Sequence, residues 1–217
     1  MNTVKSIFNQ LLQVTTNLIH NTPALHQFAV VPDDLQYVYR IPVYKPVIDC
    51  LAIDLPTMHL PAGHLPAGHL PATHLPQAST PAQPLIDALL NAAPYAQWRT
   101  TYTADQLGTD FINRYGYIEL YGPEGHYNSQ QSRAFIGYWG NHLNYPLHSH
   151  EAEEIYYIVA GEALFGVDDH ALQLRQPQDT QTHSSWQSHR MITENSAVLC
   201  LVLWRGDGLA GSASLNT

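Results

Sequence analysis

The chain has 217 residues, of which 45% are hydrophobic and only 12% are charged, and its formal net charge is -9. This size and apolar content predict a globular fold with an ample core, and the negative charge argues against a nucleic-acid partner. No apolar run is long enough to cross a membrane. The N-terminus shows neither a signal-peptide core nor a cleavage site, so we expect a cytoplasmic protein.

The first part of the chain predicts a helix followed by irregular structure. Residues 2–20 carry apolar side chains at helical spacing, which is typical of an amphipathic helix that packs on the rest of the domain. Residues 23–56 are punctuated by prolines, and within them residues 36–44 alternate Tyr and Val in a way that suits a short extended segment.

A five-residue repeat follows, built from four His-Leu-Pro units between His59 and Pro76. Each proline removes a backbone donor and disfavours helix at the preceding residue, so the tract predicts an extended or turn-rich loop. We interpret it as a tandem duplication tolerated in a surface loop. The alternative is an auxiliary metal-binding loop, because the tract holds four of the 13 histidines.

Two further helices are expected before the sequence changes character. Residues 82–93 carry an apolar face at helical spacing. Thr103 and Gln106 have the spacing of a capping box, so a third helix should begin there and end at Gly116.

From Tyr117 onward the chain consists of short β-like runs separated by turn residues. The runs are residues 118–121, 134–139, 154–160, 162–167, 171–174 and 197–204. Regularly spaced short strands predict a barrel or a double-sheet jelly roll. We therefore expect a helical region, residues 1–115, that includes the repeat loop, followed by a β-barrel, residues 116–217.

The segment around which this barrel is organised has the pattern His-x-His-x3-Glu-x6-Gly. If the segment is extended, His148, His150, Glu154 and Tyr156 share one face, because side chains alternate along a strand. Imidazole nitrogens and a carboxylate oxygen suit a borderline divalent metal such as Fe, Mn, Co, Ni or Zn. A fourth ligand is still required.

This pattern resembles the first sequence motif of the cupin superfamily, whose second motif supplies one further histidine. The resemblance implies a mainly β fold, the cupin double-stranded β-helix or jelly-roll barrel, with an N-terminal helical extension. The candidates for the further ligand are His183 and His189. We favour His189, because Met191, Ile192 and the strand of residues 197–204 follow it closely, whereas His183 lies in a loop rich in Gln, Thr and Ser.

Three side chains are candidates for roles beside the open metal positions. Tyr156 lies two residues after Glu154 and so on the same strand face; its phenol, with an ordinary pKa of about 10, becomes a base if a cation stabilises the phenolate. Tyr145 precedes His150 by five residues, and we expect it to lie at the same opening of the barrel. Trp204 offers a ring face to a cationic group, with core packing as the alternative.

A more specific resemblance rests on several segments between roughly residues 95 and 205. They are Trp98-Arg-Thr-Thr-Tyr102, Arg114-Tyr-Gly116, Glu119-Leu-Tyr-Gly-Pro123-Glu-Gly125, Tyr145-Pro-Leu-His148-Ser-His150, Ala152-Glu-Glu-Ile-Tyr156 and Leu203-Trp204. Together they are similar to the cupin-type dimethylsulfoniopropionate lyases. The resemblance implies metal ligands His148, His150, Glu154 and His189, a catalytic base at Tyr156, and active-site roles in the substrate pocket for Tyr145 and Trp204.

The reaction implied by this family is a metal-dependent β-elimination that gives dimethyl sulfide and acrylate and needs no organic cofactor. The substrate is a small sulfonium carboxylate, whose cation Tyr145, Trp204 and Tyr138 or Trp139 could hold by cation–π contacts. Two alternatives stay open: another metal-dependent cupin enzyme, a dioxygenase or an isomerase, and a non-enzymatic small-molecule-binding cupin. The oligomeric state is also open, with a homodimer as one alternative.

Overall fold

The computed structural model describes residues 2–55 and 81–216, and the predicted repeat loop between His59 and Pro76 lies outside these residues. The helical elements are α1 (Asn2–Asn21), α2 (Pro23–Phe28), α3 (Val47–Asp54), α4 (Gln83–Ala92), η1 (Ala93–Tyr95), α5 (Ala104–Leu107) and α6 (Thr109–Arg114). The strands are β1 (Gln36–Tyr37), β2 (Tyr115–Gly122), β3 (Tyr127–Asn128), β4 (Arg133–Trp139), β5 (Asn144–Ser149), β6 (Glu153–Gly161), β7 (Ala163–Val167), β8 (Gln173–Arg175), β9 (Thr180–His183), β10 (His189–Ile192), β11 (Val198–Arg205) and β12 (Ser214–Leu215).

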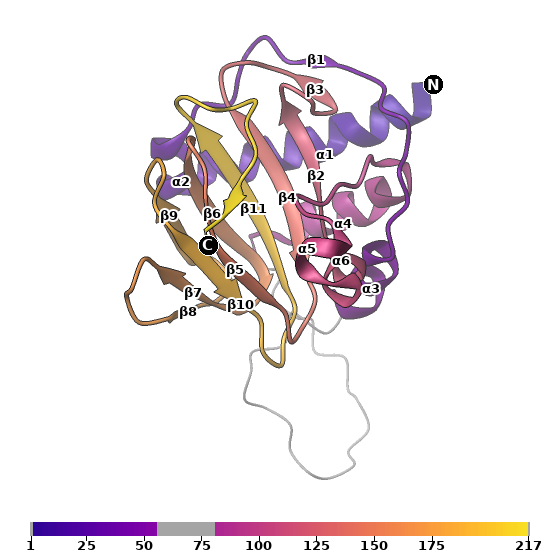
Figure 1. Ribbon diagram of the computed structural model, residues 1–217. Coiled ribbons are helices and arrows are strands. Elements are labelled where there is room, and N and C mark those ends of the chain that lie inside the picture. The colour runs from indigo at the N-terminus through magenta and orange to yellow at the C-terminus, as the bar shows by residue number, and fades with distance from the viewer. Residues whose placement is uncertain (1, 56–80, 217) are drawn as a thin grey trace, which may run out of the picture.

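The strands form two sheets that face each other (Figure 1). The larger sheet has the order β1-β3-β2-β4-β11-β6-β9, and the smaller one has the order β12-β5-β10-β7-β8. From β4 to β12 the chain crosses repeatedly between the sheets, because β5, β7, β8, β10 and β12 belong to one and β4, β6, β9 and β11 to the other. This arrangement confirms the mainly β cupin barrel with an N-terminal helical extension.

The proline-rich part of the N-terminal region contains two helices that the sequence did not predict. Pro23 occupies the first turn of α2, and Pro46 is the N-cap of α3. Proline is tolerated at these positions because the first backbone N–H groups of a helix have no intrahelical partner. Of the expected extended segment, residues 36–44, only β1 is a strand, and an isolated bridge joins Val43 to Gln97.

The helix expected from Thr103 to Gly116 is divided in two. The predicted capping box of Thr103 and Gln106 is present at the start of α5. Gly108 then takes a φ of +86°, which glycine adopts without strain, and α6 begins after it. The prediction that Gly116 ends the helix is wrong, because α6 ends at Arg114 and Gly116 lies within β2.

The central strands of the larger sheet, β2, β4, β11 and β6, are buried on both faces, which explains why they appear in the sequence as nearly continuous apolar runs. On β6, Tyr157 belongs to the core shared with the N-terminal helices, whereas Tyr156 belongs to the core inside the barrel. Helices α1 and α4 pack against the outer face of this sheet, and their side chains Phe8 and Leu89 belong to the core between them and the sheet. The division at residues 115 and 116 stays a prediction, since the two parts share this core.

None of the helices described is both long and apolar enough to span a membrane.

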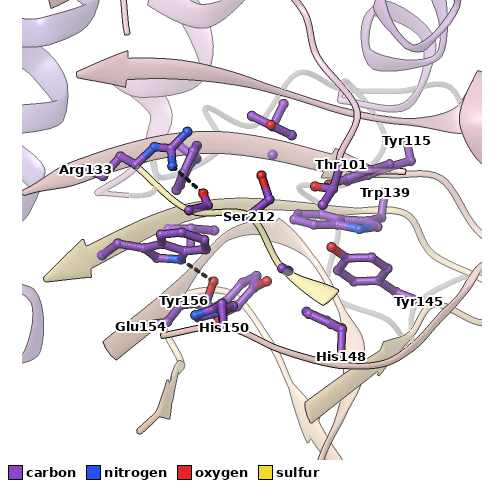
Figure 2. Close-up of a pocket in the computed structure, with 17 residues that line it drawn as sticks. Thr101, Tyr115, Arg133, Trp139, Tyr145, His148, His150, Glu154, Tyr156 and Ser212 are labelled. Atoms are coloured by element: carbon purple, nitrogen blue, oxygen red, sulfur yellow. Dashed lines mark hydrogen bonds and ion pairs between the residues drawn. The ribbon is translucent and has the colours of Figure 1, made fainter. Parts of the chain in front are cut away.

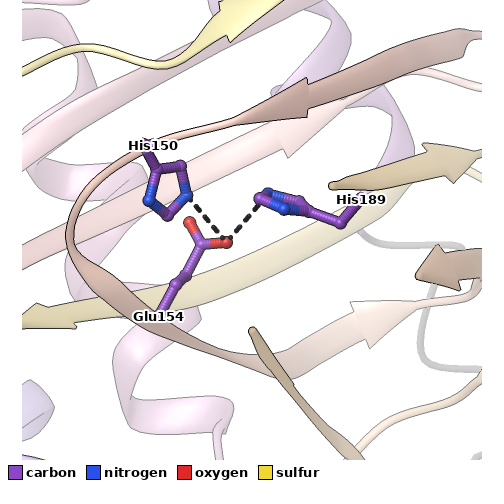
Figure 3. Close-up of side chains that lie close together, drawn as sticks. All are labelled: His150, Glu154 and His189. Carbon is purple, nitrogen blue, oxygen red and sulfur yellow. Dashed lines mark ion pairs between the residues drawn. The ribbon is translucent and has the colours of Figure 1, made fainter. Parts of the chain in front are cut away.

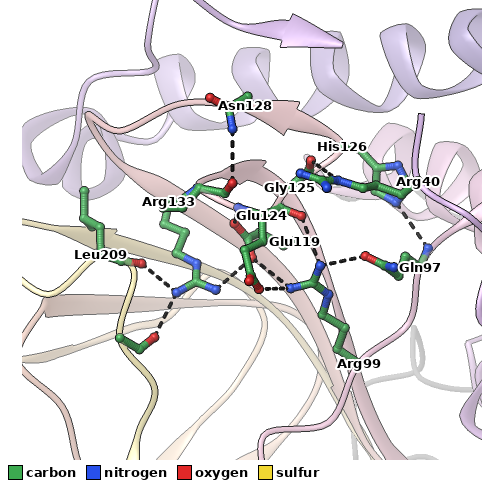
Figure 4. Close-up of polar contacts among 12 residues, drawn as sticks. Arg40, Gln97, Arg99, Glu119, Glu124, Gly125, His126, Asn128, Arg133 and Leu209 are labelled. Atoms are coloured by element: carbon green, nitrogen blue, oxygen red, sulfur yellow. Dashed lines mark hydrogen bonds and ion pairs between the residues drawn. The ribbon is translucent and has the colours of Figure 1, made fainter. Parts of the chain in front are cut away.

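A buried ionic network fixes one wall of the barrel interior (Figure 4). The Glu119 carboxylate accepts a hydrogen bond from Arg133 at 2.8 Å, and Arg99 lies 3.8 Å away. Arg133 also donates to the backbone carbonyls of Leu209 at 2.6 Å and Gly211 at 3.1 Å. Arg133 therefore fastens the C-terminal segment to β4.

Candidate metal centre

The predicted metal ligands come from three strands of the two facing sheets. His148 lies on β5, His150 follows that strand directly, Glu154 lies on β6 and His189 begins β10. The assumption of one extended segment through His148 and Tyr156 is wrong, because the chain bends at residues 151–152 and passes from one sheet to the other. The side chains still converge, because both sheets direct them into the barrel.

Three of these four side chains form a compact buried group (Figure 3). The ligand atoms of His150, Glu154 and His189 all lie within 4.8 Å of one another. Oε2 of Glu154 is 3.4 Å from Nε2 of His150 and 3.3 Å from Nε2 of His189. His148 lies outside this group, although its ring centroid is 4.1 Å from that of His189.

Backbone hydrogen bonds fix the tautomers of the histidines. The Nδ1 atoms lie 2.8 to 2.9 Å from carbonyl oxygens, in the pairs His148–Pro146, His150–Ala152 and His189–Gln187. Because a carbonyl can only accept, each Nδ1 carries the proton and each Nε2 keeps its lone pair. The Nε2 atoms of His150 and His189 are buried and accept no hydrogen bond from any part of the chain described. Unpartnered lone pairs beside a carboxylate fit a divalent cation.

The electrostatics of the site favour an ionised carboxylate at Glu154 and act in opposite directions on His148 and His150. Burial lowers the pKa of His148 to about 3. Burial also opposes the charge of His150, but the Glu154 carboxylate outweighs it and raises the pKa of His150 above its ordinary value. Burial opposes ionisation of Glu154, but its contacts with His150, His183 and His189 hold the pKa of the carboxyl well below its ordinary value. Metal binding needs the ionised carboxylate and neutral imidazoles, so an ion bound here would replace any proton held on Nε2 of His150.

Two side chains hold the Glu154 carboxylate in place. The indole N–H of Trp204 donates to Oε1 at 2.7 Å, and Nδ1 of His183 donates to Oε2 at 2.8 Å. The expected loop position of His183 is wrong, since it ends strand β9 and is buried. The sequence predicted a ring face for substrate at Trp204, and it contained no signal for either hydrogen bond to the carboxylate.

A pocket lies over this group and brings the remaining candidates together (Figure 2). Tyr145, Tyr156 and Trp204 all line it, as do His148, His150 and Glu154. Its wall also includes residues that sequence reasoning did not select, namely Thr101, Tyr115, Tyr117, Arg133, Phe135, Gly137 and Val202. Trp139 lines the pocket, but Tyr138 points to the helices, where it hydrogen-bonds Asp54.

Both tyrosines nearest the group are fully protonated at neutral pH. Burial, followed by the charge of Glu154, raises the pKa of Tyr156 well above its ordinary value of 10. Burial, followed by the neighbouring Tyr115 and Tyr102, does the same to the pKa of Tyr145. Ionisation of either phenol therefore needs a compensating positive charge.

Comparison with known proteins agrees with this geometry. The family model for dimethylsulfoniopropionate lyase matches residues 42–200. The dimethylsulfoniopropionate lyase DddQ of Ruegeria pomeroyi is 34% identical over 200 residues, which cover 92% of this chain and 90% of DddQ. The crystal structure of DddQ matches with a TM-score of 0.82 at 33% identity, over 97% of this chain and 96% of that one.

A chain from the crystal structures of the DMSP lyases RdDddP and RnDddQII matches with a TM-score of 0.85 at 36% identity, over 99% of this chain and 100% of that one. Both structural matches include the N-terminal helices as well as the barrel, since they cover nearly the whole chain. The chain therefore belongs to the dimethylsulfoniopropionate lyase family and is an enzyme with the cupin fold.

Proposed function

We propose that the enzyme cleaves dimethylsulfoniopropionate by β-elimination to dimethyl sulfide and acrylate, with one divalent transition-metal ion. The observation that carries the proposal is the group of unpartnered imidazole nitrogens around Glu154, at a pocket that Tyr156 also lines. The relatives named as lyases of this compound support the choice of substrate.

The residues proposed to hold the ion are His148, His150, Glu154 and His189. A set of three imidazoles and one carboxylate suits Fe, Mn, Co, Ni or Zn, and it leaves positions open on a five- or six-coordinate ion. Nδ1 of His148 bonds a backbone carbonyl, as do the Nδ1 atoms of the two histidines of the compact group, so the neutral rings share one tautomer. This shared anchoring supports its place in the set.

Tyr156 is the proposed general base. A bound divalent cation would supply the positive charge that stabilises both a phenolate at Tyr156 and the negative charge that develops on the substrate carboxylate. The Tyr156 ring is held between Trp139, at 6.1 Å between centroids, and Phe165, at 5.3 Å. Packing against these two rings restricts the orientation of the Tyr156 side chain.

The elimination balances with these groups alone. Tyr156 removes a proton from the carbon next to the carboxylate, and that electron pair forms the C=C bond of acrylate. The C–S bond breaks with its electron pair on sulfur, so the sulfonium leaves as neutral dimethyl sulfide. A neutral leaving group needs no acid catalyst.

The pocket also supports a substrate-binding role for Tyr145 and Trp204. The Tyr145 ring lies 4.3 Å from the ring of His148 and 5.9 Å from that of Trp139. A sulfonium against these rings gains a cation–π interaction worth about 0.5 to 2 kcal/mol at each contact. Trp204 also lines the pocket, and its indole N–H donates to the Glu154 carboxylate.

The test is a headspace assay for dimethyl sulfide. Purified protein receives Fe(II), Mn(II), Co(II), Ni(II) or Zn(II) and then dimethylsulfoniopropionate. We expect sulfide with at least one metal, and silence with all five would end the proposal. An oxygen electrode run in parallel separates the lyase from a cupin dioxygenase, which would consume oxygen.

The role of Tyr156 is tested separately with a neighbour on the same strand as the control. Tyr156→Phe should retain metal and lose activity by roughly 10²- to 10⁴-fold, the usual contribution of a general base. Tyr157→Phe should stay active, because Tyr157 faces the helices. Near-normal turnover in Tyr156→Phe would show that another group takes the proton.

A further inference from the structure

We infer that His183 is a positioning residue that fixes the Glu154 carboxylate in the orientation needed to bind the metal ion. The inference rests on the metal site of the proposed function, but it concerns a side chain outside the four proposed ligands. His183 does not belong to the compact group whose ligand atoms lie within 4.8 Å of one another.

The sheet register makes His183 a direct neighbour of Glu154. In the larger sheet β6 lies between β11 and β9. Glu154 is opposite Trp204 on β11 and opposite His183 on β9. Directly opposite residues place their Cβ atoms about 4.5 to 5.5 Å apart on the same face. The backbone therefore places one hydrogen-bond donor on each side of the carboxylate.

Each carboxylate oxygen receives a hydrogen bond from one of these neighbours. Trp204 donates to Oε1 at 2.7 Å, and His183 donates to Oε2 at 2.8 Å. Oε2 is also the oxygen that faces the unpartnered nitrogens of His150 and His189. The hydrogen bond from His183 thus fixes the oxygen that would become the metal ligand.

His183 also packs against two other proposed members of the site. Its ring stacks on that of His189, with 3.8 Å between centroids and 14° between planes. Its edge contacts Tyr156, with 5.7 Å between centroids. Two explanations thus compete with the hydrogen-bond role: His183 could act only by packing, or it could itself be a ligand through its buried, unpartnered Nε2.

Two substitutions separate the hydrogen bond from the packing. His183→Asn places its amide nitrogen on Cγ, as Nδ1 is in histidine, and so keeps a donor while losing the ring. His183→Phe keeps the ring and its stack on His189 while losing the donor. The control is His170→Phe, because His170 is exposed and its Nδ1 bonds only the carbonyl of Val167.

The readout is Co(II) affinity, measured by chelator competition and by the visible spectrum of the bound ion, so it does not depend on lyase activity. We expect His183→Phe to bind Co(II) about 10- to 100-fold more weakly, as is usual when a group that orients a ligand is lost. His183→Asn and His170→Phe should stay near wild-type affinity. Unchanged affinity in His183→Phe with a loss in His183→Asn assigns His183 to packing and overturns the inference. Equal losses in both variants also overturn it, because they indicate that the imidazole itself binds the ion.

A measurement on the wild-type protein covers the case in which a variant fails to fold. Protein with ¹⁵N-labelled histidine is loaded with ¹¹³Cd(II), and nitrogen–cadmium couplings are recorded by NMR. We expect couplings at His148, His150 and His189 and none at His183, which should carry its proton on Nδ1. A coupling at His183 would make it a ligand and overturn the inference. A silent headspace assay with these results intact would refute only the proposed reaction.

Discussion

Gly137 supports the pocket wall in a way that a single methyl group can test. Gly137 and Trp139 both line the pocket from β4, two residues apart and so on the same face. A Cβ at Gly137 would lie 2.7 Å from both Cη2 and Cζ3 of the Trp139 ring, against 3.4–4 Å in an ordinary contact. The indole therefore lies directly over the glycine, and Gly137→Ala forces it to move.

The ring has little free space except toward the pocket. Tyr115 stacks on Trp139 with 5.2 Å between centroids, and Tyr145 lies 5.9 Å away. Overpacking of this kind costs about 1 to 3 kcal/mol, which corresponds to a fall in Tm of roughly 2 to 12 °C for a protein of this size. We expect Gly137→Ala to show this loss in calorimetry and a raised KM in the headspace assay.

A double-mutant cycle tests whether the indole is the cause. Trp139→Phe removes the second ring that carries Cη2 and Cζ3, so the methyl group at position 137 then has no atom to meet. The two substitutions should couple by about 1 kcal/mol or more, with the double variant more stable than the sum of the single losses predicts. Strictly additive losses would show that the alanine acts through some other contact.

Three further outcomes are expected. Glu119→Gln leaves Arg133 buried without its 2.8 Å ionic partner and should lower the free energy of unfolding in urea by roughly 3 to 5 kcal/mol. Burial lowers the pKa of His126 to about 4. Because the unfolded chain then binds more protons than the folded protein, His126 destabilises the protein by up to roughly 3 kcal/mol as pH falls from about 6.5 to 4. Melting curves of His126→Gln recorded over this pH range should lack that part of the destabilisation. Chelation of metal present at about 1,000 times its Kd should remove about 4 kcal/mol of stability, seen as a lower Tm.

Most of the strands that the sequence predicted are buried on both faces, namely β2, β4, β6 and β11. The apolar runs of β6 and β11 are continuous and lack helical spacing, and the region around them is punctuated by Gly and Asp, so the sequence favours strands there over helices. Strand β9 is short and polar, with the sequence Thr-Gln-Thr-His, and it is a strand because β6 pairs with it. No periodicity in the four residues themselves could reveal that pairing.

The site shows the same limit. The spacing of His148, His150 and Glu154 indicates a candidate ligand set, because these residue types seldom coincide by chance at that spacing. The bend at residues 151–152 was not predicted, yet it did not disturb the convergence, since it carries the chain between two sheets that face each other. Glu154 is separated from His183 by 29 residues and from Trp204 by 50 residues along the chain. These contacts depend on the register between paired strands, which no local sequence pattern reveals.

The surroundings of Trp204 decide which way the substrate lies in the pocket. One face of its indole stacks on His150, with 4.2 Å between centroids, and the Arg133 guanidinium lies 5.4 Å from the ring. A sulfonium placed there would meet an existing positive charge in a buried, poorly screened site, where repulsion between like charges is strong. In the described part of the chain, no Arg or Lys side chain makes a cation–π contact with the rings of Tyr145 or Trp139. We therefore propose that the carboxylate end of the substrate lies beside Arg133 and the proposed metal ligands, and that the sulfonium lies against Tyr145 and Trp139.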